Sequence, residues 1–120
     1  MILVVPDKGT NYNPTNVRER LLRIISRKIL REFWENPLYR DSMEALKAWY
    51  AITSRADWGK PADVKAQFRN ASIIRGNRCV FNIAGNKYRL IVKFNYPAKI
   101  AFIRFVGTHR HYDRVDAETI

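Results

Sequence analysis

The segment Lys87–Tyr96 alternates between two kinds of side chain, and this pattern limits the possible folds more than any other feature. One set is apolar or aromatic and comprises Tyr88, Leu90, Val92, Phe94 and Tyr96. The other set carries the cations and comprises Lys87, Arg89, Ile91, Lys93 and Asn95. Because successive side chains of a strand point to opposite faces, the alternation predicts a strand with one buried face and one cationic face.

Turn residues on both sides of this strand predict that it belongs to an antiparallel meander. Gly76-Asn77 and Gly85-Asn86 suit two-residue loops, which need positive φ, and Pro97-Ala98 marks a third reversal. The predicted strands are Ser72–Arg75, Arg78–Ile83, Lys87–Tyr96 and Ile100–Val106. After them, Thr108 is expected to cap a short terminal helix that carries His109, Tyr112 and Asp113.

The first half of the domain has helical spacing instead. Leu22–Ile25 is predicted to be a strand, and Ser26 the N-cap of a helix that ends at Asn36-Pro37. A second helix begins at Asp41 or Ser42, and a third runs from Pro61 to near Phe68. This order predicts an α+β fold, with two to three N-terminal helices packed on one face of a mainly antiparallel sheet.

Size and composition indicate one cytoplasmic domain. Residues 22–120 form the predicted domain, whereas Pro, Gly and Asn residues punctuate residues 1–21, which we interpret as an extension or flexible arm. The chain has no apolar run of about eighteen residues, so no membrane span is expected. Cys79 is the single cysteine, which excludes an intramolecular disulfide and a cysteine metal site.

Charge is distributed unevenly along the chain. No Asp or Glu occurs between Val64 and Tyr112, and the net charge is +11. Ten cations lie in this stretch: Lys65, Arg69, Arg75, Arg78, Lys87, Arg89, Lys93, Lys99, Arg104 and Arg110. A cation cluster without internal counter-ions repels itself, and neutralising nucleic-acid phosphates releases bound counter-ions. The pattern therefore favours a nucleic-acid partner, although each single cation is more often part of a solvated face.

His109 is the sharpest candidate for catalysis. On a helical turn it shares a face with Tyr112 and Asp113, and a histidine that titrates near neutrality can move protons in phosphodiester cleavage. The alternative is a capping cluster with two exposed histidines, which the spacing does not exclude. A metal-dependent nuclease needs clustered carboxylates, whereas the basic stretch has none before Asp113. Metal-free RNA cleavage by the 2′-hydroxyl fits the residues best, and no cofactor is expected.

Two longer motifs resemble a known family. Val80–Leu90, together with Ile103–His109 and Tyr112-Asp113, is similar to the HigB-type toxins of the RelE-like toxin–antitoxin group. The resemblance extends over residues 23–120 and implies a RelE-like fold. It also implies a type II toxin that cleaves mRNA on the translating ribosome. The implied partners are a HigA-like helix-turn-helix antitoxin and, through that antitoxin, operator DNA.

The resemblance leaves the individual roles as hypotheses. We expect proton transfer by His109, with Lys87 or Tyr112, and orientation of His109 by Asp113. Arg89 and Arg104 are expected to hold the scissile phosphate, and further RNA contacts are expected from Arg75, Arg78, Lys93 and Arg110. If the alternation of Ile100–Val106 is unbroken, Arg104 shares a face with apolar residues and is instead partly buried and structural.

Two alternatives and one departure from the family stay open at this stage. A non-catalytic RNA- or DNA-binding module needs only the same charge field, and a ribosome-associated structural protein would bind without stopping growth. Toxins of this kind commonly begin near position 22, where this chain has Leu22 rather than Met. We therefore expect residues 1–21 to be either an extension from an upstream start or a dispensable arm.

Overall fold

The computed structural model describes residues 21–120, so the predicted arm at 1–21 lies almost wholly outside the described residues. The elements follow the predicted order of strand, helices, then consecutive strands. They are β1 (Arg23–Ile25), α2 (Arg27–Glu35), the 3₁₀ helix η1 (Pro37–Ser42), α3 (Met43–Ser54), α4 (Pro61–Gln67), β2 (Ser72–Ile74), β3 (Arg78–Ile83), β4 (Tyr88–Asn95), β5 (Ile100–Thr108) and α5 (His109–Tyr112). The α+β prediction is confirmed.

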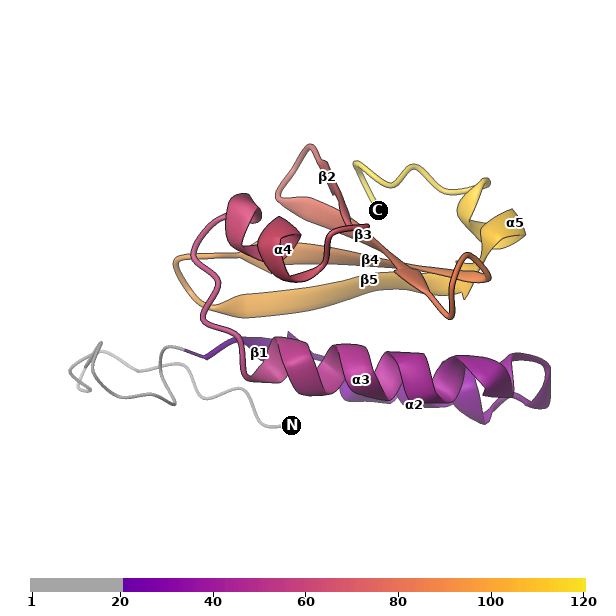
Figure 1. The fold of residues 1–120 in the computed structure, drawn as a ribbon. Helices are drawn as coiled ribbons and strands as arrows, with labels where there is room; N and C mark the ends of the chain where they lie inside the picture. Colours follow the sequence, from indigo (N-terminus) through magenta and orange to yellow (C-terminus); the bar gives the residue numbers. More distant parts are fainter. Residues whose placement is uncertain (1–20) are drawn as a thin grey trace.

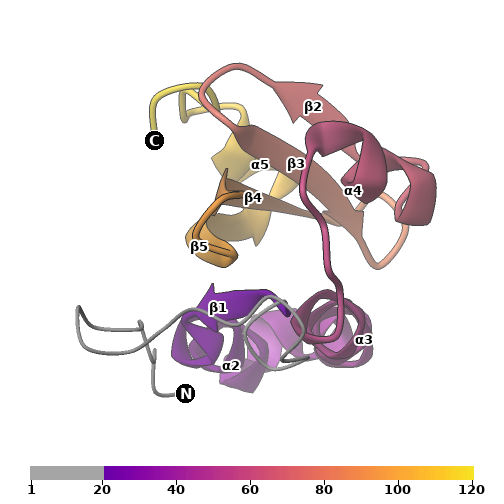
Figure 2. The ribbon, with the colours of Figure 1, turned by 90° about the vertical axis from the view of Figure 1, so that its left-hand side faces the viewer.

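The five strands form one sheet in the order β1-β5-β4-β3-β2. β1 runs parallel to β5, and every other neighbouring pair is antiparallel. Helices α2 and α3 lie side by side against one face, as Figures 1 and 2 show. None of the helices within residues 21–120 has the length and apolar character needed to span a bilayer.

The core lies between this helix pair and the sheet. Trp49 of α3 meets Phe81 of β3 with ring centroids 5.4 Å apart, and Trp58 meets Phe94 at 5.9 Å. Trp34, Trp49 and Trp58 are all buried in this core. Burying aromatic side chains of this size provides a large share of the hydrophobic stabilisation.

The connection between the two long helices differs from the prediction. The sequence predicts a break at Asn36-Pro37, and the structure has a short 3₁₀ helix there, η1. The Asn36 side chain accepts a hydrogen bond from the Leu38 N–H at 3.0 Å, which starts this turn. Ser26 does hold the N-cap position of α2, but its side chain makes no capping hydrogen bond.

The second face of the sheet is less exposed than the alternation predicted. Ile91 lies on the predicted cationic face, yet it is fully buried, and its neighbour Val80 on β3 is 4% exposed. The chain after α5 runs back over this face (Figure 1), and the Ile120 carbonyl accepts hydrogen bonds from Arg78 and Arg104. Cover by the C-terminal segment, and not by a helix, therefore gives the sheet a small second core.

A β-bulge decides the position of Arg104. Ile91 faces Phe105 and Val92 faces Ile103, so Arg104 is the extra residue of β5. The predicted common face of Arg104 with Ile100, Phe102 and Val106 assumed unbroken alternation, and it is wrong for Val106, which lies beyond the bulge. The bulge turns Val106 toward the core, and Arg104 is exposed.

Candidate active site

The short helix α5 begins with the predicted Thr108 cap. The Thr108 hydroxyl accepts the His111 N–H at 3.1 Å, and the Thr108 N–H donates to His111 Nδ1 at 3.4 Å. Both bonds close a reciprocal capping box. His111 therefore holds the start of the helix, which is a role that the sequence analysis did not give it.

His109 and Asp113 share one side of α5, as their spacing predicts. His109 Nδ1 lies 3.6 Å from Asp113 Oδ1, which is an ion-pair distance but too long for a hydrogen bond. Tyr112 lies beside them, with its ring centroid 6.4 Å from that of His109. The imidazole and the carboxylate are both more than half exposed, so an incoming phosphodiester can reach them.

Gly107 lets α5 fold back onto the sheet. A Cβ at this position would lie 2.6 Å from Phe105 Cζ and 3.1 Å from His111 Cβ, closer than side chains tolerate. A side chain here would therefore force Phe105 and His111 to shift where β5 ends and α5 begins. The turn is also held to the neighbouring strand, because the His109 N–H donates to the Lys87 carbonyl at 3.3 Å.

Lys87 brings a second group of side chains to the same place. Its ammonium contacts Asp41 Oδ2 at 2.5 Å, and the Tyr88 hydroxyl donates to the other carboxylate oxygen of Asp41. Asp41 comes from η1, so the helical half of the chain contributes to this site. The hydrogen bond from Lys87, followed by that from Tyr88, lowers the pKa of Asp41 below its usual value. Burial, followed by the bond to Asp41, raises the pKa of Tyr88 to about 12.

A cluster of aromatic rings packs against Tyr88 and His111. Phe33 stacks on Tyr39 with centroids 4.5 Å apart, and both rings meet the edge or face of Tyr88. Tyr39 also meets the His111 ring at 6.3 Å. These contacts join α2, η1, β4 and α5 at one end of the sheet, on the right in Figure 1.

Arg89 lies next to this group on the second face of the sheet. It is paired across the strands with Gly107, two residues before His109. Its Nη1 donates to the carbonyls of Asn86 at 3.1 Å and Tyr88 at 3.2 Å, and the side chain is half-buried. The structure thus brings six of the predicted residues to one end of the sheet: Lys87, Arg89, His109, Arg110, Tyr112 and Asp113.

The other predicted RNA contacts lie elsewhere. Lys93 is four residues further along β4, a separation of about 13 Å in an extended strand. Arg75 follows β2 at the opposite edge of the sheet. Arg78 is 8% exposed, and its guanidinium is bonded to the Ile120 carbonyl at 2.7 and 2.9 Å. Arg104 donates to the same carbonyl at 3.2 Å.

The basic stretch also has counter-ions that its own sequence lacks. Lys87 pairs with Asp41, and Lys99 pairs with Asp57 at 3.1 Å. The expectation of a wholly uncompensated cluster is therefore wrong for these two lysines, because folding brings acids from the helical half to them. No local sequence pattern predicts that Asp41 and Tyr39 belong to this site, because they lie about fifty residues from Lys87 and Tyr88 along the chain.

The family model for HigB toxin, described as the RelE-like toxic component of a toxin–antitoxin system, matches residues 42–115. The chain belongs to the HigB toxin family. A similar relative is the mRNA interferase HigB of Escherichia coli O6:H1, strain CFT073, with 25% identity over 79 residues. That alignment covers 64% of this chain and 77% of the relative.

Family membership confirms the resemblance seen in the motifs. The matched segment of the HigB model contains Lys87, Arg89 and the whole of α5, whereas Asp41 lies immediately before it. Within residues 21–120, no three His, Cys, Asp or Glu side chains are grouped as a metal site would require. As a member of a RelE-like toxin family, the chain is the toxic component of a toxin–antitoxin pair.

Proposed function

We propose that this chain is an mRNA endoribonuclease, the toxin of a type II toxin–antitoxin system. The observation that carries the proposal is the grouping of His109 with Lys87 and Arg89 at one open end of the sheet. An imidazole supplies proton transfer, and the cations attract a phosphodiester. The name of the Escherichia coli relative, mRNA interferase, supports mRNA as the substrate.

The proposed reaction uses the RNA's own nucleophile. The 2′-oxygen attacks the neighbouring phosphorus while a base removes the 2′-hydroxyl proton. The bond from phosphorus to the 5′-oxygen then breaks, and the departing oxygen receives a proton. The products are a 2′,3′-cyclic phosphate and a 5′-hydroxyl, and DNA is not a substrate because it lacks the 2′-hydroxyl.

Five residues on or beside α5 have roles in the proposed reaction. His109 transfers a proton, and Asp113 orients its imidazole. Lys87 or Tyr112 transfers the second proton. Arg89 neutralises charge on the phosphate as the pentavalent transition state forms, a contribution that is often the largest in such reactions.

Outer phosphates of the RNA meet cations beyond this centre. Arg110 lies on α5 itself, and Lys93, Arg75 and Arg104 are exposed along the sheet. Arg78 is not included, because its burial and its bonds to Ile120 give it a structural role. The proposal needs no metal ion or cofactor, since the RNA hydroxyl is the nucleophile and side chains move the protons.

The proposed setting is the cytoplasm, where the toxin acts on mRNA bound to the ribosome. Its antitoxin is proposed to be a HigA-like helix-turn-helix protein that binds operator DNA and carries the toxin with it. Residues 22–120 are proposed to be sufficient for activity. Leu22 is 3% exposed, and its N–H donates to the Ala56 carbonyl at 3.0 Å, so Leu22 belongs to the core.

One experiment tests the function directly. Purified protein is incubated with ribosomes translating a defined message, and the chemistry of the new 5′ and 3′ ends is determined. Cleavage that leaves 2′,3′-cyclic phosphates and 5′-hydroxyls supports the proposal. Intact but retained message would indicate a non-catalytic RNA-binding protein, and 5′-phosphate with 3′-hydroxyl ends would indicate attack by water, as in a metal-dependent nuclease. A chain that begins at Leu22 and loses cleavage while staying folded would contradict the proposed domain boundary.

A further inference from the structure

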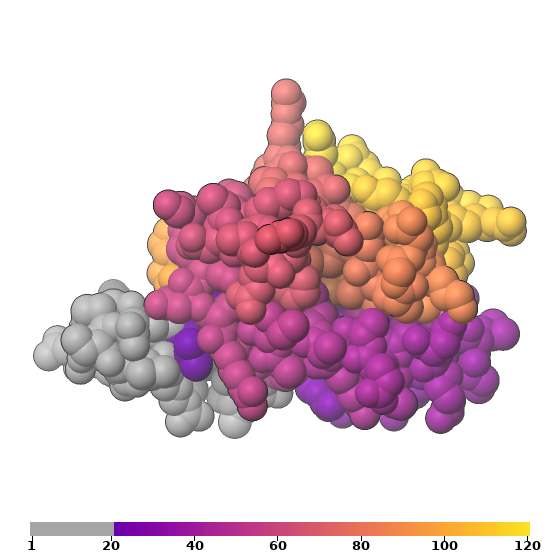
Figure 3. Space-filling view, viewed as in Figure 1, coloured from indigo at the N-terminus to yellow at the C-terminus, as the bar shows by residue number. Residues whose placement is uncertain are grey.

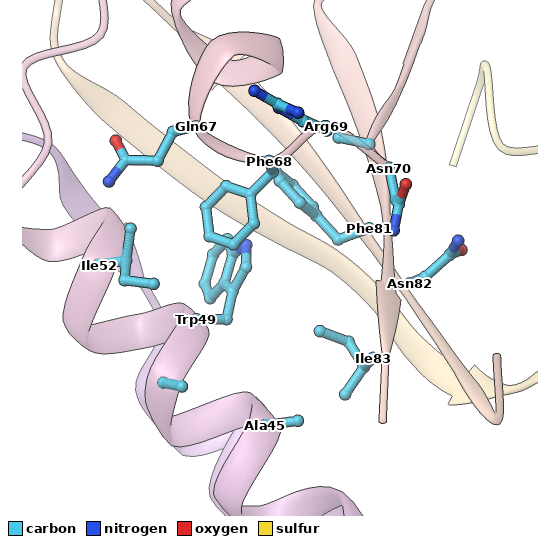
Figure 4. Close-up of a pocket in the computed structure, with 12 residues that line it drawn as sticks. Ala45, Trp49, Ile52, Gln67, Phe68, Arg69, Asn70, Phe81, Asn82 and Ile83 are labelled. Atoms are coloured by element: carbon cyan, nitrogen blue, oxygen red, sulfur yellow. The ribbon is translucent and has the colours of Figure 1, made fainter. Parts of the chain in front are cut away.

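A groove lies on the side of the molecule away from α5, between α3 and the edge of the sheet. Its volume is about 450 Å³. Figure 3 looks onto this face, with α3 along the lower part and the α4 region above it. The wall formed by α3 is apolar and consists of Ala45, Ala48, Trp49 and Ile52, with the Phe68 ring opposite (Figure 4).

The sheet edge beside this groove is only partly covered. β2 pairs with Arg78, Cys79 and Val80, so the remainder of β3 has no strand on that side. The Phe94 N–H donates to the Asn77 carbonyl at 2.8 Å, and hydrogen-bonded pairs alternate along an antiparallel ladder. By that alternation, the backbone N–H and C=O of Asn82 point away from β4, toward the open edge. Such an edge is a template for an added strand.

Arginine side chains at the edge of the groove favour an acidic partner. Arg69 lines the groove, and Arg55 lines a hollow that continues it past Ile52 and Gln67. Among residues 21–120, the ion pairs include neither arginine. Arg55 also borders a hollow lined by Asp57 and Asp63, whereas no acidic side chain of the described residues lines the groove that holds Arg69. An occupant with carboxylates is therefore favoured over a basic or neutral one.

One polar atom in the groove wall also lacks a partner. Trp49 is 1% exposed, and its indole N–H has no acceptor within the described chain. Buried donors without acceptors are uncommon in folded proteins. A main-chain carbonyl brought into the groove, with a small shift of the neighbouring side chains, would provide the acceptor.

We propose that this groove binds the antitoxin, through an extended segment that pairs with Asn82 and carries apolar side chains and at least one carboxylate. The apolar side chains pack on Ala48 and Ile52, and the carboxylate meets Arg69. The inference rests on the proposed toxin function. No residue that lines the groove belongs to α5 or to the Lys87–Asp41 pair, so the proposed neutralisation does not require the antitoxin to fill the active site.

Two variants test the groove. Ala48→Trp fills it from an exposed helix position, and Arg69→Glu reverses the rim charge. Ala62→Trp is the matched control, because Ala62 is an exposed alanine on α4 that lines none of these hollows. Each variant is expressed with and without the helix-turn-helix protein encoded beside the toxin, and the same purified protein is titrated onto each in a calorimeter.

Ala48→Trp and Arg69→Glu are expected to arrest growth as the wild type does, yet to escape neutralisation, with antitoxin affinity at least tenfold weaker. Ala62→Trp is expected to be neutralised normally. Hydrogen exchange at the Asn82 amide is expected to slow when the antitoxin binds. Circular dichroism identifies a variant that fails to fold, in which case the other variant and the exchange result decide.

Failure of this inference is distinguishable from failure of the proposed function. Folded groove variants that bind antitoxin as the wild type does, or an Asn82 amide that stays unprotected, would overturn the groove alone. Folded variants that lose toxicity would also overturn it, since the groove would then belong to the toxic activity. A wild-type chain that binds antitoxin but leaves mRNA intact would overturn the nuclease and leave the groove standing.

Discussion

The Asp41 carboxylate lies 2.5 Å from the Lys87 ammonium, although 46 residues separate them in the sequence. This contact ties the 3₁₀ turn between the helices to the first residues of β4. It also fixes the position of a lysine that we propose to act at the scissile phosphate. The site is therefore shared between the helical half and the sheet half of the chain.

The first prediction concerns proton transfer. His109→Ala is expected to lower the single-turnover rate of RNA cleavage by about 10²- to 10⁴-fold, the usual range for a lost general acid or base. His111→Asn is the control, since Asn can still accept a hydrogen bond from the Thr108 N–H. Cleavage by His109→Ala at the wild-type rate would remove this imidazole from the mechanism.

The second prediction separates orientation from chemistry. Asp113→Asn is expected to lower the cleavage rate by no more than about fivefold, because an exposed ion pair contributes at most about 1 kcal/mol. The 3.6 Å separation from His109 agrees with a weak interaction. A loss as large as that of His109→Ala would show that Asp113 takes part in the chemical step itself.

The third prediction follows from the pKa of Tyr88. Its phenol titrates near 10 in an unfolded chain and near 12 in the folded protein, so the folded state binds this proton more tightly. Stability from the neutral phenol is therefore complete below pH 10 and is lost as the pH rises toward 12. Urea unfolding should show a smaller alkaline loss in Tyr88→Phe than in the wild type. Equal alkaline losses of stability in the two proteins would contradict the raised pKa of Tyr88.

The fourth prediction tests the close packing at Gly107. Gly107→Ala is expected to push Phe105 and His111 apart and to displace α5, with a loss of about 1–3 kcal/mol in the free energy of unfolding. RNA cleavage should fall because His109 moves with the helix. Gly85→Ala is the space control, since nothing lies within 4 Å of a Cβ there. Gly85 has a positive φ, so Gly85→Ala reports only the backbone strain that an added Cβ causes. Full activity in Gly107→Ala would contradict this prediction.

The fifth prediction distinguishes two arginines of the basic stretch. Arg89→Gln is expected to weaken RNA binding and to reduce the salt dependence of affinity by about one counter-ion, while leaving stability nearly unchanged. Arg78→Gln is expected to cost about 1–3 kcal/mol of stability, because its buried bonds to Ile120 are lost. Binding titrations at several salt concentrations and urea unfolding of both variants check this prediction. Weaker RNA binding in Arg78→Gln with a stability loss in Arg89→Gln would contradict it.

Local patterns were enough to predict most of the elements. Alternation at Tyr88–Phe94 placed the central strand, helical spacing placed α2 and α3, and Thr108 with His109 marked the start of α5. These signals depend on residues within a few positions of one another, so they are present in the sequence before any tertiary contact forms. The family motifs are local in the same sense, and they predicted the HigB family.

Long-range contacts decided the remainder. The bulge at Arg104, the cover over Ile91 and the pairing of Lys87 with Asp41 each join segments far apart in the chain. The sequence by itself determined which side chains are cations and which segments are strands. Only the tertiary structure decided which cations meet a counter-ion, since charges interact through space and their separation in space is set by the packing of α2 and η1 against the sheet.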